Sequence, residues 1–229
     1  MHVVVRPQPA DAAAAAAELL AGHLAAAGAP IDLGLAGGTT PRAAYRLLRD
    51  RDLPWDRVWC WLPDERWVPP NHPDSNARMV REELLDHVPA SFDAPNTATT
   101  DPHRAAAEYE NRILPRFLRG GAVAPDLVLL GVGADGHTAS LFPHTEAVSI
   151  DRIGYVANWV PALGAWRLTA TLPLLRAARK VVFLVTGREK APVVAQILER
   201  EIPHPARLVA EGAAEAVWIL DEAAAAELS

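Results

Sequence analysis

Short apolar runs rich in β-branched residues alternate along this chain with longer segments whose apolar residues have helical spacing. This alternation is the strongest restriction on the fold, because strands separated by helices pair in parallel and the helices then cover the sheet. The sequence therefore predicts an α/β protein with a mainly parallel, Rossmann-like sheet and helices on both faces. The predicted strands cover residues 3–6, 31–36, 58–62, 127–132, 168–171, 181–185 and 217–220.

Helical patterns fill the intervals between these strands. The predicted helices cover residues 10–27 and 190–201 and the segments after Pro41, Ser75 and His103. The Pro-, Asn- and Thr-rich segments at 69–73 and 94–102 are too short for interdomain linkers. A chain of 229 residues can bury most of its apolar surface in one core, so we predict a single domain over residues 1–229.

The charge and cysteine content limit the partners and the compartment. The formal net charge is −6 and no run of Lys or Arg is present, so nucleic acid is not the expected partner. Cys60 is the only cysteine, which excludes an internal disulfide. The first nine residues lack the pattern of a secretory signal, and no apolar stretch has the length of a membrane span. We therefore expect a cytoplasmic protein without a membrane partner, either a monomer or a small homo-oligomer.

Polar and glycine-rich segments follow four of the predicted strands. In an open parallel sheet, ligands bind beyond the carboxyl ends of the strands, where the loops converge. We therefore expect a single pocket built from these four segments, which are residues 37–41, 63–66, 133–137 and 186–190.

The first of these segments has the composition of a phosphate site. Gly37 and Gly38 permit a close approach of the backbone, and Thr39 and Thr40 add hydroxyl groups. Thr40 is the predicted N-cap of the following helix, with Pro41 at the first helical position. A phosphate placed there would receive backbone N–H groups at the positive end of the helix. The alternative is an ordinary turn between a strand and a helix.

The third segment contains Gly131, Gly133 and Gly136, which formally match a dinucleotide fingerprint. We reject that interpretation because Pro143 closes the segment before a long helix can follow. No acidic residue stands at a strand end about 20 residues further on. No organic cofactor is therefore predicted.

His137 follows this turn and is the candidate general base, since imidazole exchanges a proton near neutral pH. Asp135 is expected to orient its ring, although a histidine that merely caps the turn is the alternative. No metal site is predicted, because His-Glu-x-x-His, a cysteine pair and a compact histidine cluster are all absent. Ser140 lies in no Gly-x-Ser-x-Gly elbow, and Cys60 within its apolar run is interpreted as a packing residue.

Three cationic residues are candidates for binding a phosphate dianion. Arg66 follows Asp64 and Glu65 at a strand end, Arg167 begins a predicted strand, and Lys190 begins a predicted helix. For Arg66 the alternative is a surface ion pair of little energetic value.

These motifs together resemble the 6-phosphogluconolactonase family that is related to glucosamine-6-phosphate deaminase. The resemblance covers nearly the whole chain and is most specific at Asp-Gly-His-Thr-Ala-Ser-Leu-Phe-Pro, residues 135–143. It implies the glucosamine-6-phosphate isomerase/deaminase fold. Next to Arg167 the chain departs from the family, with Ala-Leu-Gly-Ala-Trp at 162–166 in place of a Lys-Pro-Pro-like approach. The other matching segments are residues 35–47, 64–69, 75–76, 131–134, 167–169, 185–187 and 190–191.

The resemblance implies hydrolysis of 6-phospho-D-glucono-1,5-lactone to 6-phosphogluconate in the oxidative pentose phosphate pathway, without metal or organic cofactor. It also implies that His137 activates water. Arg66 or the backbone amides of residues 133–137 are the candidate donors to the oxyanion. Two alternatives remain: a sugar-phosphate deaminase of the same fold, for which residues 138–143 lack the expected acidic residue, and a non-catalytic sugar-phosphate sensor.

Overall fold

The computed structural model describes all residues from 1 to 229 and has a parallel sheet at its centre. Seven strands lie in the order β1-β12-β11-β8-β2-β3-β5, and every neighbouring pair is parallel. The predicted mainly parallel sheet is thereby confirmed. The strands are β1 (His2–Arg6), β2 (Ile31–Gly34), β3 (Val58–Trp61), β5 (Ser91–Phe92), β8 (Leu127–Leu130), β11 (Lys180–Val185) and β12 (Glu215–Asp221).

A second, antiparallel sheet has the order β4-β10-β9. Its strands are β4 (Asp64–Arg66), β9 (Tyr155–Val160) and β10 (Ala165–Ala170), and a small hairpin pairs β6 (Leu118–Arg119) with β7 (Ala122–Val123). The strand predicted at 168–171 therefore belongs to this antiparallel sheet and not to the parallel one. The reason lies in Gly164, whose φ of 56° closes a short turn after β9, and a short turn joins only antiparallel strands.

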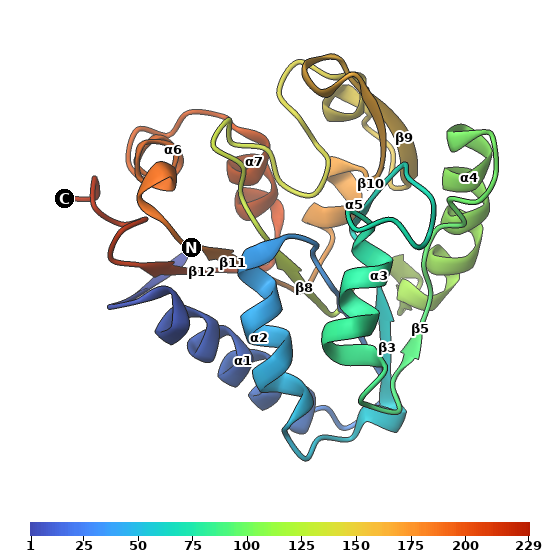
Figure 1. The fold of residues 1–229 in the computed structure, drawn as a ribbon, viewed down its shortest axis with the longest axis horizontal. Coiled ribbons are helices and arrows are strands. Elements are labelled where there is room, and N and C mark those ends of the chain that lie inside the picture. The colour runs from blue at the N-terminus through green and yellow to red at the C-terminus, as the bar shows by residue number, and fades with distance from the viewer.

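Helices pack on both faces of the parallel sheet, as predicted (Figure 1). One face carries α1 (Pro9–Ala25), α2 (Thr39–Arg49) and α3 (Asn76–Val80), which continues as a π-helical turn at Arg81–Leu85. The other face carries α4 (Pro102–Ile113), α5 (Leu172–Arg176), α6 (Ala191–Leu198) and α7 (Pro205–Gly212). The short helices α5 and α7 have no counterpart among the predicted helices. None of the helices is long and apolar enough to cross a membrane.

Alternate residues of the central strands divide the core into two layers. In β8, Leu127 and Leu129 pack towards α1 and α2, whereas Val128 and Leu130 pack towards α4 to α7. Because both faces are covered, these strands are continuously apolar, as the sequence pattern indicated. Cys60 in β3 is fully buried, and burial raises the pKa of its thiol. Its predicted role as a packing residue agrees with this position. The prediction of one domain over residues 1–229 remains a prediction.

A carboxyl pair joins β2 to β8 at their amino ends. The Asp32 N–H donates to Asp126 Oδ2 at 3.2 Å, and the Asp126 N–H donates to Asp32 Oδ1 at 3.1 Å. Arg119 Nη2 donates to both carboxyl groups, at 3.1 Å to Asp32 and 2.7 Å to Asp126. Burial, and then the charge of Asp126, raise the pKa of Asp32 to about 8. Burial next to a second carboxyl group thus favours the protonated form of Asp32.

Candidate active site

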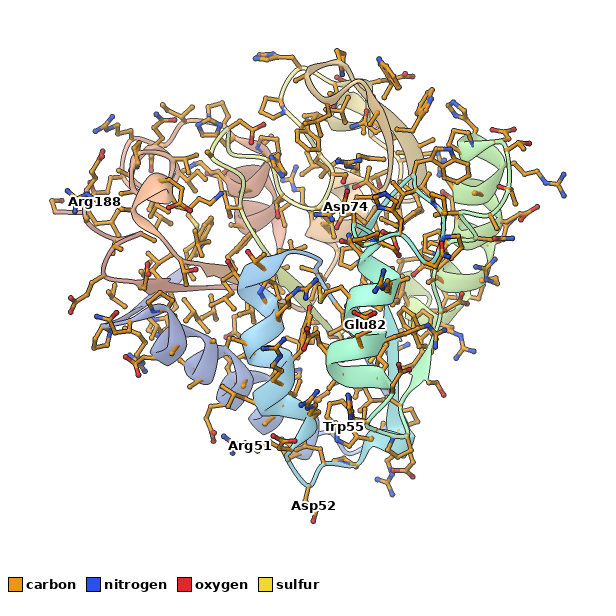
Figure 2. The ribbon with its side chains drawn as sticks, in the orientation of Figure 1. Arg51, Asp52, Trp55, Asp74, Glu82 and Arg188 are labelled. Atoms are coloured by element: carbon orange, nitrogen blue, oxygen red, sulfur yellow. The ribbon has the colours of Figure 1, made fainter.

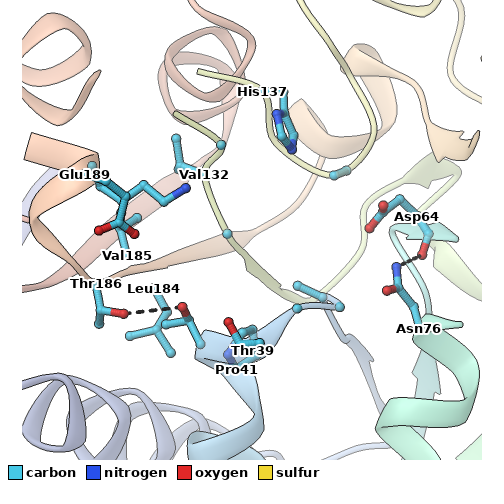
Figure 3. A pocket seen from close by; sticks show the side chains of 18 of the residues that line it. Thr39, Pro41, Asp64, Asn76, Val132, His137, Leu184, Val185, Thr186 and Glu189 are labelled. Atoms are coloured by element: carbon cyan, nitrogen blue, oxygen red, sulfur yellow. Dashed lines mark hydrogen bonds between the residues drawn. The ribbon is translucent and has the colours of Figure 1, made fainter. Parts of the chain in front are cut away.

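The carboxyl ends of β2, β3, β8 and β11 meet on the side of the sheet opposite to this carboxyl pair. The amino end of α2 lies at this edge. Arg51 and Asp52 follow the carboxyl end of α2 and lie far from Asp74 (Figure 2). A cavity of about 300 Å³ opens among the strand ends (Figure 3). All four segments predicted from the sequence contribute to its wall. Of the predicted site residues it brings together Gly37, Gly38, Thr39, Thr40, Arg66, His137 and Lys190.

The cradle between β2 and α2 is built differently from its prediction. Gly38 occupies the N-cap position with a φ of 101°, and α2 already begins at Thr39. The predicted N-cap at Thr40 is wrong because a glycine in this conformation turns the chain into the helix two residues earlier. Thr40 instead lies in the first turn, where its Oγ1 is 3.3 Å from Thr186 Oγ1 at the end of β11. This contact ties the cradle to the end of β11, which β8 separates from β2 in the sheet.

His137 lies at the cavity wall and is held by the loop that follows β8. The Gly133 N–H donates to the His137 carbonyl at 2.8 Å, and the ring stacks on Phe142 with centroids 4.0 Å apart. Its Nδ1 is 2.5 Å from Asp135 Oδ1. Gly133 has room for no side chain, since a Cβ there would overlap the imidazole and approach Asp135 Oδ1 to 2.6 Å.

The protonation states of this pair follow from its geometry. Burial raises the pKa of Asp135, but the hydrogen bonds and charge of His137 outweigh it and leave the pKa below its usual range. A carboxylate can only accept, so Nδ1 carries a proton, and in the neutral imidazole Nε2 is then the free acceptor. Figure 3 shows the imidazole ring directed into the cavity. Asp135 itself does not line this cavity and contacts it only through His137.

Arg66 and Arg167 lie side by side on β4 and β10. Arg66 lines the cavity, and its Nη1 donates to the Asp74 carbonyl at 2.8 Å; it forms no ion pair, unlike the alternative considered for it. Arg167 does not line the cavity. Burial, and then the charge of Arg66, lower the pKa of Arg167. Arg167 thus pairs with Arg66 but does not line the cavity, at the place where the sequence departs from the family pattern, and its predicted role as a phosphate ligand remains a prediction.

Lys190 reaches the cavity from the segment after β11. Gly187, with a φ of 101°, turns the chain into a 3₁₀ helix at Arg188–Lys190, and its N–H donates to Asp221 Oδ1 at 3.0 Å. Lys190 takes part in no ion pair, so its ammonium group is available to an anion. No group of three or more His, Cys, Asp or Glu side chains is close enough to hold a metal ion.

Sequence reasoning assigned no role to Asp64 and Asn76 and considered Glu65 only as an alternative proton acceptor, although all three lie in motifs that it singled out. The Glu65 carboxylate is 1% exposed and accepts from the N–H groups of Arg66, Asn76 and Ala77 at 2.6 to 2.7 Å. Burial raises its pKa, against the effect of these donors. Glu65 thereby fixes the start of α3 relative to β4. Asp64 and Asn76 line the cavity itself.

An amide cradle and a histidine–aspartate pair that face each other across one cavity are the parts of an α/β enzyme for a small anionic substrate. The chain belongs to the family of glucosamine-6-phosphate isomerases/6-phosphogluconolactonase, which matches residues 7–218. A 6-phosphogluconolactonase of Nostoc sp. is 42% identical over 206 residues, which cover 86% of this chain and 84% of the relative.

Solved structures show the same similarity. The 6-phosphogluconolactonase from Trypanosoma brucei is 29% identical and superposes with a TM-score of 0.87 over 100% of this chain and 98% of its own. A monomeric glucosamine-6-phosphate deaminase has a TM-score of 0.84 over 99% of this chain and 100% of its own, at 22% identity. The predicted fold and family resemblance are confirmed.

Proposed function

We propose that this chain hydrolyses 6-phospho-D-glucono-1,5-lactone to 6-phosphogluconate, the second step of the oxidative pentose phosphate pathway. Curated relatives that are named 6-phosphogluconolactonase support this reaction. The observation that carries the mechanism is the free Nε2 of His137 on a cavity whose opposite wall is the Gly37–Thr40 cradle. A sugar that carries a phosphate at one end and a reacting carbonyl at the other fits this cavity, with the phosphate at the cradle and the carbonyl at His137.

The reaction follows from these positions. The cradle amides, the Thr39 and Thr40 hydroxyls and the Lys190 ammonium bind the phosphate. Phosphate binding then holds C1 of the lactone at His137. The binding energy of the phosphate, which lies far from C1, is thus used to align C1 with the base. Nε2 removes a proton from water as the water oxygen attacks C1, and Asp135 stabilises the imidazolium that forms.

Attack on C1 leaves a negative charge on the former carbonyl oxygen. Arg66 and the backbone amides of residues 133–137 are the candidate donors to this oxyanion. When the intermediate collapses, the bond between C1 and the ring oxygen breaks, and the imidazolium returns its proton to that oxygen. The product is the open-chain acid, and no other reactant is consumed.

A glucosamine-6-phosphate deaminase is the second candidate, because the deaminase fold superposes on this chain. The segment after His137 contains no acidic residue until Glu146, which begins a 3₁₀ helix at Glu146–Ser149 and does not line the cavity. This observation favours the lactonase. Ammonia release from glucosamine 6-phosphate at a rate comparable to lactone opening would reverse the choice.

The test is a coupled assay of 6-phosphogluconate formation, with spontaneous lactone opening subtracted. We expect catalysed opening with the phosphorylated lactone and a much lower kcat/KM with unphosphorylated gluconolactone, because the cradle then has no anion to bind. Equal kcat/KM for the two lactones contradicts the phosphate site. Binding of the lactone without any catalysed opening would instead identify a sugar-phosphate sensor.

We also propose a cytoplasmic site of action, which the phosphorylated substrate supports because its charge keeps it from crossing membranes. The proposed partner is this small molecule alone, for a monomer or small homo-oligomer that binds no nucleic acid. Sedimentation of the purified protein tests the oligomeric state.

A further inference from the structure

The side chain of Asn76 contains a buried acceptor that the mechanism above does not use. Asn76 is 1% exposed and lies at the cavity wall, and its Oδ1 has no hydrogen-bond partner. Buried polar atoms are nearly always paired, and one without a partner destabilises the folded protein. An orphaned acceptor beside a cavity is therefore a place where a ligand is expected to donate a hydrogen bond.

The orientation of the Asn76 amide is fixed by the hydrogen bond that its NH2 group donates. Asn76 Nδ2 donates to the Asp64 carbonyl at 2.9 Å. A carbonyl oxygen can only accept, so exchanging Oδ1 and Nδ2 would bring two acceptors together. Figure 3 shows this hydrogen bond and the Asn76 amide on the same wall as Asp64. Oδ1 therefore faces away from Asp64.

The cradle leaves space for the Asn76 amide on that side. A Cβ on Gly37 would overlap Asn76 Oδ1, although the φ of Gly37 is not positive. Gly37 is therefore a glycine for lack of space and not for backbone conformation. The amide oxygen therefore lies against Gly37, at the beginning of the cradle.

The chemistry of this wall selects the kind of group that binds there. A phosphate dianion carries no proton to donate, so it cannot satisfy Oδ1. Asp64 adds a carboxylate, of which Oδ2 accepts from Ser140 Oγ at 2.7 Å and Oδ1 accepts nothing. Negative charge next to Asn76 disfavours phosphate at this wall and favours neutral donors. Among the groups of a sugar phosphate, these are the hydroxyls.

We infer that Asn76 is a specificity-determining residue whose Oδ1 accepts a hydrogen bond from a secondary hydroxyl at C2, C3 or C4 of a sugar-acid 6-phosphate. The inference rests on the proposed function, which places the phosphate in the cradle and C1 at His137. With both ends so held, the carbons between them pass the Asn76 wall. The residue contacts substrate and takes no part in proton transfer.

The test measures affinity and not turnover, so it does not depend on the base. Calorimetric Kd values are determined for 6-phosphogluconate, its 2-, 3- and 4-deoxy analogues and inorganic phosphate. The proteins are the wild type, Asn76→Leu and Ser75→Ala. Wild type should bind at least one deoxy analogue about tenfold or more weakly than 6-phosphogluconate, because a site built for a hydroxyl rejects the analogue without it. Asn76→Leu should bind that analogue and 6-phosphogluconate within twofold of each other.

Ser75→Ala is the matched control, since Ser75 Oγ donates to Glu65 Oε2 at 3.1 Å in the same network but offers the cavity no acceptor. It should keep the wild-type discrimination. Unchanged affinity for inorganic phosphate shows that the cradle is intact in each variant, and Asn76→Ala replaces Asn76→Leu if the latter does not fold. Discrimination retained without the Asn76 amide, or absent from wild type, overturns the inference alone. Failure of wild type to bind 6-phosphogluconate overturns the proposed function with it.

Discussion

Gly133→Ala is the most informative single change, because it moves the catalytic pair without removing any of its atoms. The φ of Gly133 is not positive, so the backbone accepts alanine. The new methyl group would overlap the His137 ring and lie 2.6 Å from Asp135 Oδ1. Both obstructing groups are partly exposed side chains, so they can swing aside and the protein should still fold.

The size of the displacement sets the expected loss. Ordinary contact with a Cβ begins at 3.4 Å, so the Asp135 oxygen must retreat by at least 0.8 Å, and the closer imidazole by more. Misplacement of a catalytic group by about 1 Å costs about 10² in rate, or about 2.7 kcal/mol of transition-state stabilisation. The free energy of unfolding should change by less than about 1 kcal/mol, because alanine also restricts the unfolded chain.

The assay compares kcat/KM and the urea unfolding midpoint of Gly133→Ala with those of wild type. Gly28→Ala is the control, since Gly28 has open space around its Cα and a φ that is not positive. The decisive variant is the double substitution Gly133→Ala/His137→Asn. If the methyl group acts through His137, the double variant should be no slower than His137→Asn alone. Wild-type activity in Gly133→Ala, or fully multiplicative losses in the double variant, would refute this reasoning.

Four further predictions concern the base, the cation, metals and the carboxyl pair. His137→Asn should lower kcat by about 10² to 10⁴ while 6-phosphogluconate still binds, and near-native turnover by a folded variant would assign the proton to another group. Arg66→Ala should raise KM, and lower kcat as well if Arg66 stabilises the oxyanion; unchanged kinetics would remove it from the site. Exhaustive chelation should leave activity intact, whereas a loss restored by a divalent ion would contradict the mechanism. Because the pKa of Asp32 is raised to about 8, the folded state retains a proton that the unfolded chain loses near the ordinary aspartate pKa of about 3.9. The free energy of unfolding should therefore fall as pH rises from about 4 to about 8, and Asp32→Asn should flatten this slope in denaturant titrations. An unchanged slope would show that Asp32 is ionised in the folded protein.

The parallel sheet could be predicted because its signal is local. Residues such as Leu127 to Leu130 are apolar without interruption and are bounded by polar segments, which is sufficient to identify a buried parallel strand. The convergence of the strand ends then follows from the parallel topology alone. For this reason the cradle, the histidine loop, Arg66 and Lys190 were correctly expected at one cavity.

The failures arise where distant segments determine the outcome. The start of α2 depends on the φ of Gly38, which glycine permits but does not require. The position of Arg167 beside Arg66 depends on how β10 pairs with β4, and no local pattern specifies that pairing. Asn76 becomes an orphaned acceptor only because Asp64 and Gly37 surround it after folding. Sequence motifs identified these residues, but only the tertiary arrangement gives them their chemistry.

Because the single cysteine is buried, the rate at which its thiol reacts can report how often the core opens. Cys60 is 0% exposed at the centre of β3, and its raised pKa keeps it as the unreactive thiol. A thiol reagent can therefore modify the chain only when the core layer around Cys60, which α1, α2 and α3 cover, opens. The rate of labelling at limiting reagent thus reports the equilibrium between the closed and open forms of this layer, and at saturating reagent it reports the rate of opening itself. Any ligand that binds the folded cavity should slow this labelling in proportion to its occupancy, without an engineered probe.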